Sequence, residues 1–90
     1  MRRSEMPTTT AAPTVTVRYW AAARAATGTD SEQRAGATVG EVVDAAVVAH
    51  PALGRVASVA SFLLDGRKVT RDQTVAPGAT VEVLPPFAGG

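Results

Sequence analysis

One long amphipathic helix is the strongest pattern in this sequence of 90 residues. Thr38-Val39-Gly40-Glu41 has the form of a capping box, in which a threonine side chain caps the helix and a glutamate three residues later reaches back to it. Behind it, apolar residues recur at helical spacing: Val39, Val42, Val43, Ala46 and Val47. Pro51 marks the end, because a proline disfavours helical angles at the residue before it. This is the main helix, and its apolar face must be covered by the rest of the chain.

Short segments on both sides of this helix have the pattern of strands. The sequence alternates from Val15 to Trp20. One face of that strand carries Val15, Val17 and Tyr19, which we expect in the core, and the other carries Thr16, Arg18 and Trp20. Ser61–Leu64 is a short apolar run. Asp65-Gly66 follows it and favours a type I′ hairpin, since that turn needs positive φ at both central residues. Residues 67–69 are therefore the expected return strand.

Other segments complete the predicted order of elements. Ala76–Ala79 fits a type II turn, with proline at its second position and glycine at its third. The last predicted strand, Thr80–Leu84, follows that turn, with Val81 and Val83 facing one way. The alanine-rich segment Ala21–Thr27 predicts a short helix that ends at a Gly28 cap. Asp30–Ala35 is polar and reads as a loop by propensity, or as an exposed edge strand if it pairs at all.

A helix packed on one face of a mixed sheet is a two-layer α+β domain, and these patterns leave the order of the strands open. We expect the domain to span residues 14–84. Residues 1–13 are rich in threonine, proline and small side chains without periodicity, which predicts a disordered arm. Residues 85–90 form an extended tail that ends in Gly-Gly.

Composition excludes several classes of function. A net charge of +1 with scattered basic residues gives no electrostatic basis for binding nucleic acid or a membrane. No cysteine is present, so disulfides, thiolate metal sites and cysteine nucleophiles are excluded. No signal peptide or spanning segment is predicted, and we expect a cytoplasmic protein. A core this small leaves little stability to support an elaborate active site. A carrier or binding module is favoured over an independent enzyme.

The candidates for acid–base chemistry or metal binding are few. His50 is the single histidine, and its place at a helix end before Pro51 indicates a surface or capping role. The aspartates Asp44, Asp65 and Asp72 do not have the spacing of a carboxylate pair. Neither a nucleophile–base set nor a phosphate loop is recognisable, so no metal site is predicted.

The C-terminal hexapeptide has a different character. Pro85-Pro86 cannot continue a ladder and favours a stiff, extended stalk. Phe87 and Ala88 follow, and then Gly89-Gly90, which is thin because glycine has no side chain. Fully extended, the segment reaches about 20 Å. A narrow terminus beyond a stiff stalk points to the α-carboxylate of Gly90 as the reactive group, although glycine-rich chain ends also occur without a function.

From Val15 to Gly90 the chain resembles the MoaD/ThiS family of ubiquitin-like sulfur carriers, in particular the small subunit of molybdopterin synthase. The features that carry the resemblance, in order, are Val17–Ala21, Arg24, Thr27–Thr29, Thr38–Val42, Asp65-Gly66, Pro77-Gly78 and Val81–Gly90. The ending Pro-Pro-x-x-Gly-Gly is the most specific of them. The resemblance implies a β-grasp fold: a mixed four- to five-stranded sheet, one main helix on one face, and parallel first and last strands at the centre.

The resemblance also implies the chemistry and the partners. An E1-like adenylyltransferase/sulfurtransferase would use ATP and Mg²⁺ to adenylate Gly90, and a sulfur donor would convert it to a thiocarboxylate. This chain would bind no cofactor and would act as a carrier subunit rather than as an enzyme on its own. Its acceptor would be the large subunit of molybdopterin synthase or another sulfur-accepting enzyme. Carriers for thiamine thiazole or cysteine synthesis, and a non-catalytic β-grasp interaction module, remain alternatives.

The partner-binding residues implied by the resemblance share the face opposite the helix. Trp20 and Leu84 match apolar contact positions of the family, and Arg18 is expected to pair there with Glu82. Lys68 stands where such carriers can have an apolar residue, so it is a departure within the predicted docking face. A tryptophan that folds back into the core is the alternative at Trp20.

Overall fold

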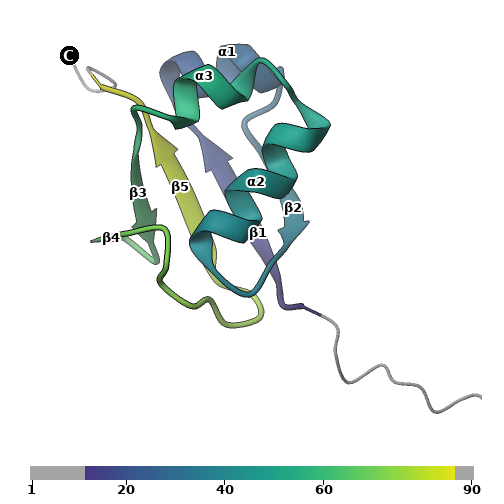
Figure 1. The fold of residues 1–90 in the computed structure, drawn as a ribbon, viewed down its shortest axis with the longest axis vertical. Helices are drawn as coiled ribbons and strands as arrows, with labels where there is room; N and C mark the ends of the chain where they lie inside the picture. Colours follow the sequence, from purple (N-terminus) through teal and green to yellow (C-terminus); the bar gives the residue numbers. More distant parts are fainter. Residues whose placement is uncertain (1–11, 87–90) are drawn as a thin grey trace, which may run out of the picture.

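The computed structural model describes residues 12–86 and shows helices on one face of a mixed sheet (Figure 1). The five strands are ordered β2-β1-β5-β3-β4. The elements are β1 Thr14–Tyr19, α1 Ala21–Thr27, β2 Ser31–Ala35, α2 Val39–Ala49, α3 Leu53–Ala57, β3 Ser61–Leu64, β4 Arg67–Val69 and β5 Thr80–Leu84. Most of the predicted N-terminal arm, and residues 87–90 of the tail, lie outside the described residues.

The centre of the sheet is the parallel pair of β1 and β5. In its register Arg18 lies beside Glu82, and Tyr19 beside Val83. The three remaining pairs of neighbours, β2 with β1, β5 with β3 and β3 with β4, are antiparallel. This arrangement confirms the expected α+β, β-grasp fold, and its sheet has five strands.

The core lies between the sheet and the helices, and the alternation of the sequence sets its composition. Val15, Val17 and Tyr19 from β1 and Val81 and Val83 from β5 are buried, as predicted. The helices contribute Val39, Val42, Val43 and Ala46 from α2, Ala23 from α1, and Leu53 and Ala57 from α3. Most of these side chains are small, so the layers are held together by close packing of many valine and alanine methyl groups.

The start of α2 is capped by side-chain hydrogen bonds and by backbone hydrogen bonds to a neighbouring loop. Thr38 Oγ1 accepts from the Glu41 backbone N–H at 3.1 Å, as in a capping box. The carboxylate of Glu41 accepts from the Ala37 N–H at 2.9 Å, so the return bond reaches one residue further back than a reciprocal box predicts. The N–H groups of Val39 and Gly40 donate to backbone carbonyls of the loop that precedes β5. The backbone N–H groups in the first turn of α2 therefore already have hydrogen-bond acceptors.

Replacing Thr38 by alanine should lower the free energy of unfolding by about 1 kcal/mol, because the Glu41 N–H then loses its acceptor. Thr38→Ser keeps the hydroxyl and should recover most of this loss. Chemical denaturation of both variants measures the difference. Equal destabilisation by the two substitutions would show that the threonine methyl group, not the cap, is what matters.

Two elements differ from what local sequence patterns favour. The polar segment Ser31–Ala35 is a strand, β2, because β1 supplies a complete antiparallel partner along its length. It is the exposed edge strand that was the alternative to a loop. The helix α3 was not predicted, and its Leu53 is fully buried in the core, where α3 packs against α1 and α2. Tertiary packing decides both, since neither segment has a strong propensity of its own.

The predicted turns are confirmed. Asp65 and Gly66 both have positive φ, 49° and 87°, as a type I′ hairpin requires. Gly78 has φ 83°, and the Ala79 N–H donates to the Ala76 carbonyl at 3.1 Å, which closes the type II turn before β5. Within the described residues, no helix has both the length and the apolar character needed to cross a membrane.

Candidate functional site

The predicted docking residues Arg18, Trp20, Lys68 and Leu84 lie on the sheet face opposite the helices, together with Leu63 and Glu82. We call this surface the outer face. The register of the sheet places four of these residues in one row across the strands. Lys68 of β4 pairs with Leu63 of β3, Leu63 with Glu82 of β5, and Glu82 with Arg18 of β1. Leu84 is the last residue of β5 and Trp20 directly follows the last residue of β1, so both lie at the same end of the sheet because β1 and β5 are parallel.

Trp20 is held on the outer face by two charged neighbours. Its indole Nε1 donates to Glu82 Oε1 at 2.8 Å. The Arg18 guanidinium lies 4.9 Å from the centroid of the Trp20 ring, a cation–π geometry. Trp20 is half-buried there and is not part of the core, so the alternative of a tryptophan folded inward is wrong.

The expected ion pair between Arg18 and Glu82 is also wrong. The two residues are direct neighbours across β1 and β5, yet each side chain contacts Trp20 instead. The physical reason is that the carboxylate satisfies the indole N–H, while the ring face attracts the guanidinium. An exposed ion pair is worth only about 0–1 kcal/mol, so it is readily replaced.

Leu63 belongs to the outer face although the sequence reading did not include it. It is half-buried and lies between Lys68 and Glu82 in the row across the sheet. The signal was the alternation of β3, in which Phe62 points into the core and the next residue must point out. Because Ser61–Leu64 is apolar at three successive positions, its pattern does not by itself distinguish the outward Leu63 from its inward neighbours. Lys68 is exposed and Leu84 is half-buried.

The tail begins beside this surface. Pro85 is buried directly after β5, and Pro86 is exposed. The Trp20 backbone N–H donates to the carbonyl of Val83 at 3.3 Å, which places the tryptophan next to the end of β5. The predicted reactive carboxylate of Gly90, with Phe87, Ala88 and Gly89, lies outside the described residues.

The ThiS family model matches residues 17–90 of the chain, which covers β1 from Val17 through to the terminal glycines. The chain belongs to the ThiS family. This confirms the resemblance to ubiquitin-like sulfur carriers of the MoaD/ThiS type. Among curated proteins, none matches the chain by sequence.

Solved structures extend the comparison. SAMP1 from Haloferax volcanii is 27% identical, with a TM-score of 0.76 over 86% of this chain and 99% of its own. A Pyrococcus furiosus protein described as molybdopterin converting factor, subunit 1, is 26% identical, with a TM-score of 0.71 over 82% of this chain and 98% of its own. SAMP1 from Methanosarcina acetivorans, at 22% identity and a TM-score of 0.80 over 88% and 98%, supports the fold alone.

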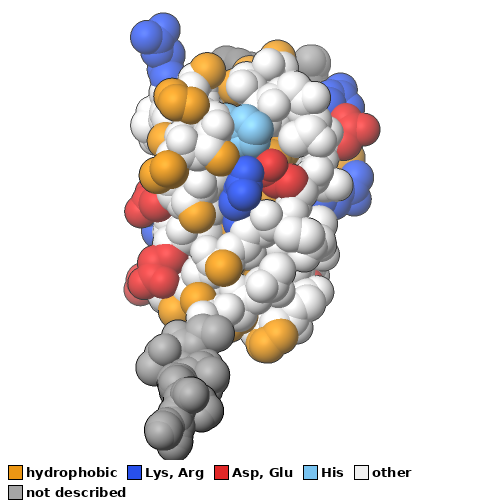
Figure 2. All heavy atoms as spheres, turned by 90° about the vertical axis from the view of Figure 1, so that its right-hand side faces the viewer, with side chains coloured by type: hydrophobic (Ala, Val, Ile, Leu, Met, Phe, Trp, Pro, Cys, Tyr) orange, Lys and Arg blue, Asp and Glu red, His pale blue; other side chains and the backbone are white. Residues whose placement is uncertain are grey.

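This ThiS-family chain carries one polar cluster that its sequence did not reveal. On the helix side of the sheet, Glu32 of β2 accepts a short hydrogen bond from the buried Tyr19 hydroxyl. His50 Nε2 lies 2.9 Å from Glu32 Oε2, and Arg34 donates to Glu32 Oε1 at 3.0 Å. Figure 2 shows the histidine beside an acidic and a basic side chain on the side where β2 and α2 lie. His50 caps the end of α2, as predicted, and also links that helix to the edge strand.

The electrostatics of this cluster point to a structural role. Burial, and then the hydrogen bond to Glu32, raise the pKa of Tyr19 well above its usual value. Burial alone would raise the pKa of Glu32, but hydrogen bonds from Tyr19 and His50 and the charge of Arg34 outweigh it and lower that pKa. The phenol stays protonated and the carboxylate ionised, so neither is poised to transfer a proton near neutral pH. Among residues 12–86, no group of three acidic, histidine or cysteine side chains could hold a metal ion.

Glu32→Gln should lower the free energy of unfolding at pH 7 by roughly 1.5–3 kcal/mol, since its bonds are charge-assisted. A carboxyl whose pKa is lower folded than unfolded stabilises the fold above its unfolded pKa, about 4.3. That contribution is lost as the pH falls through the folded pKa. The variant should therefore lose less stability than wild type on acidification, as urea unfolding at neutral and acidic pH measures. Glu41→Gln is the control, and an unchanged acid dependence in Glu32→Gln would contradict this reading.

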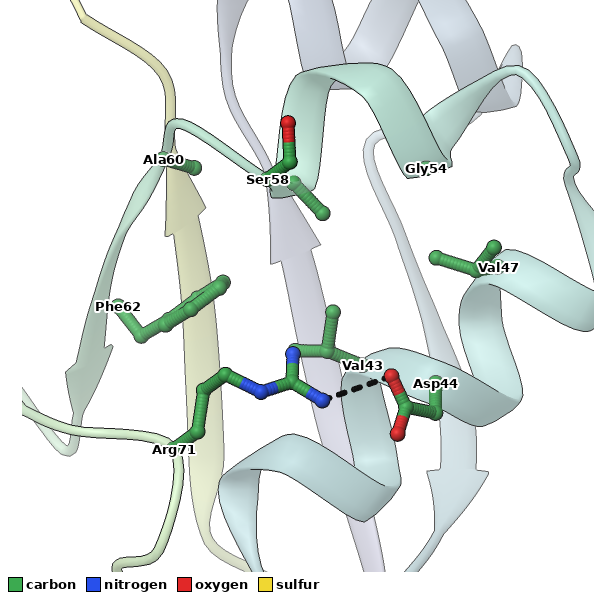
Figure 3. Close-up of a pocket in the computed structure, with 9 residues that line it drawn as sticks. Val43, Asp44, Val47, Gly54, Ser58, Ala60, Phe62 and Arg71 are labelled. Carbon is green, nitrogen blue, oxygen red and sulfur yellow. Dashed lines mark hydrogen bonds and ion pairs between the residues drawn. The ribbon is translucent and has the colours of Figure 1, made fainter.

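A groove of about 600 Å³ lies on the helix side between α2, α3 and β3. Phe62 lines one wall and Val43 and Val47 the other, as Figure 3 shows. Arg71 reaches across the groove and pairs with Asp44 at 2.8 Å. The pair is exposed and neutral overall, and the lining holds no nucleophile beside a base. The groove is therefore a weaker candidate for function than the outer face.

Proposed function

We propose that this chain is a sulfur carrier whose Gly90 carboxylate is activated and converted to a thiocarboxylate. One observation carries the proposal: the parallel pair of β1 and β5 brings Trp20, Leu84 and the start of the tail to the same end of the sheet. A partner that docks on the outer face would lie beside the root of the tail. Membership of the ThiS family supports the same reading.

The proposed chemistry places the catalytic groups on the partners. A carboxylate is a poor electrophile, so an E1-like enzyme first joins it to AMP with ATP and Mg²⁺, releasing pyrophosphate. The outer sulfur of a persulfide then displaces AMP to give an acyl disulfide. A thiol attacks the donor's sulfur of that disulfide, which releases the thiocarboxylate and leaves a disulfide between the thiol and the donor. Gly89-Gly90 suits this sequence because two residues without side chains can enter a narrow active site. This chain supplies a carboxyl group and a docking surface.

For the acceptor, we favour sulfur donation to a pterin precursor in molybdenum cofactor synthesis, with the large subunit of molybdopterin synthase as partner in the cytoplasm. The similarity to the Pyrococcus furiosus converting-factor subunit supports this choice. Sulfur transfer to the thiazole of thiamine or to a cysteine precursor would use the same chemistry. Deletion of the gene followed by supplementation with each pathway product distinguishes these acceptors.

Intact-protein mass spectrometry after co-expression with the E1-like enzyme of the same genome tests the carrier function. We expect one oxygen-to-sulfur exchange, located at Gly90 by the C-terminal peptide. The Haloferax volcanii neighbour is named a modifier, and a modifier role here would instead give covalent conjugates to other proteins. A chain that gains neither sulfur nor a conjugate would be a non-catalytic interaction module, and the proposal would fail.

A further inference from the structure

Three features of the described chain converge on one side chain, Trp20. Glu82 accepts its indole N–H at 2.8 Å, and the Arg18 guanidinium covers its ring at 4.9 Å. The third feature is the backbone of the next residue. Ala21 has φ 47°, in the left-handed region that residues with a side chain seldom adopt. Such a conformation costs of order 1 kcal/mol or more and persists only where its surroundings impose it.

The strained residue marks the point where the chain changes direction. Trp20 is still extended, with φ −116° and ψ 147°, and its carbonyl already accepts the first hydrogen bonds of α1. The chain thus passes from the sheet into a helix without a linker. Its sharp turn leaves Trp20 on the outer face while Ala23, three residues later, is buried on the helix side.

The Trp20 indole is fixed and half-buried, and both properties suit this side chain to binding a partner. Aromatic anchors dominate protein interfaces, because a large rigid ring buries much area for little loss of conformational freedom. Part of the ordering cost is already met here, since the hydrogen bond and the guanidinium restrict the ring before any partner arrives. Leu63 and Leu84, both half-buried, extend the apolar surface on either side of Glu82.

The charges on the outer face indicate the chemistry of the partner. Arg18 and Lys68 are exposed at the two ends of the row that also contains Leu63 and Glu82. The one carboxylate in that row, Glu82, is occupied by the indole of Trp20. Arg18 also contacts the Trp20 ring, but unlike Glu82 its side chain stays exposed. The surface offered to a partner is therefore apolar at the centre and cationic at the rim, which complements an apolar socket bordered by carboxylates.

We propose that Glu82 and Arg18 are positioning residues that hold Trp20 as a preorganised anchor, and that the activating enzyme binds it in an apolar socket bordered by carboxylates. The identity of the partner rests on the proposed function. The hold on Trp20 does not, since it is a property of the free chain.

The hold on the indole is tested in the free protein. Trp20 is the single tryptophan, so all indole fluorescence reports on it. Glu82→Ala should raise the acrylamide quenching constant about twofold or more and lower the anisotropy, because the ring loses its acceptor. Glu82→Gln keeps an oxygen at the same place and should remain near wild type, with Glu41→Gln as control. Unchanged quenching in Glu82→Ala would overturn the positioning role.

A double-mutant cycle tests how Glu82 acts on binding. Glu82→Ala should weaken binding to the activating enzyme by about fivefold to tenfold, within the coupling expected of contacting residues. In a Trp20→Ala background the same change should have no further effect. An equal loss in both backgrounds would mean that Glu82 touches the partner directly or shapes β5, and the positioning role would be overturned.

The charge of the socket is tested with salt and with two variants. Lys68→Gln should slow association and reduce its dependence on ionic strength, because rim charges act mainly on the rate of encounter. Arg18→Gln should do the same and should also speed dissociation, because the Trp20 ring loses its guanidinium contact. Association that is insensitive to salt would overturn the acidic socket.

If wild type gains sulfur but Trp20→Ala gains it at the same rate, the anchor role of Trp20 is wrong and the carrier function stands. If the quenching and binding results hold but sulfur never appears, the carrier function is wrong.

Discussion

Removal of Gly90 is expected to reduce sulfur loading by more than a hundredfold while the melting temperature stays unchanged. The terminal carboxylate then belongs to Gly89 and is displaced by about 3.3–3.6 Å, the length of one residue. A misplacement of even 1 Å in an active site can cost about 10² in rate. The fold should be unaffected, since the core ends at Val83 and the buried Pro85. Mass spectrometry after reaction with the activating enzyme measures the loading, and calorimetry the stability.

Extension of the chain gives the complementary test. Adding one alanine after Gly90 removes the glycine carboxylate without shortening the tail, and loading should again be lost. The matched control adds the same residue before Met1, which lies at the other end of the chain. If the extended chain gains sulfur without first being trimmed, the reactive group is not the carboxylate of Gly90.

Trp20→Ala is expected to weaken binding to the activating enzyme by 2–4 kcal/mol, roughly 30-fold to 1,000-fold, as for central aromatic anchors. Its effect on the free energy of unfolding should be smaller, because the half-buried ring lies outside the core cluster. Isothermal titration calorimetry and thermal denaturation give the two quantities on the same samples. The prediction requires that the loss of binding free energy exceed the loss of free energy of unfolding.

Val48→Ala is the matched control for this prediction. Val48 is the most exposed large apolar side chain of the described residues, 82% accessible. It lies on α2, on the opposite side of the sheet from the outer face. Its loss should change neither binding nor stability appreciably. If Trp20→Ala lowers stability more than affinity, the tryptophan is a structural residue and the docking surface lies elsewhere.

The parts of the fold that the sequence predicted correctly have strong local causes. The α2 helix follows from its cap at Thr38 and its apolar spacing, and the β3–β4 hairpin from Asp65-Gly66. The strand β2 and the helix α3 have no such cause. Ser31–Ala35 is polar on both faces and becomes a strand because β1 offers it a ladder. The short α3 helix is stabilised by burial of Leu53 in the core and by packing against α1 and α2.

The sequence also predicted which residues share the candidate site, but not how their side chains interact. Alternation alone put Arg18 and Trp20 on one face of β1, and the family resemblance supplied the parallel neighbour that adds Leu84. Which side chains then interact depends on the competition between an ion pair, an indole hydrogen bond and a cation–π contact. The cluster of Tyr19, Glu32 and His50 joins three elements that are distant in sequence, so no local sequence pattern predicts it.

The central pairing of β1 with β5 also has a consequence for synthesis. The middle of the sheet is completed by β5, which is synthesised after the other four strands of this sheet, so the sheet cannot be completed progressively from its N-terminal end. A chain that stops before Thr80 lacks both the parallel neighbour of β1 and the acceptor of the Trp20 indole N–H. Prematurely terminated chains would therefore present no ordered surface to the activating enzyme and would not compete with finished carriers for it.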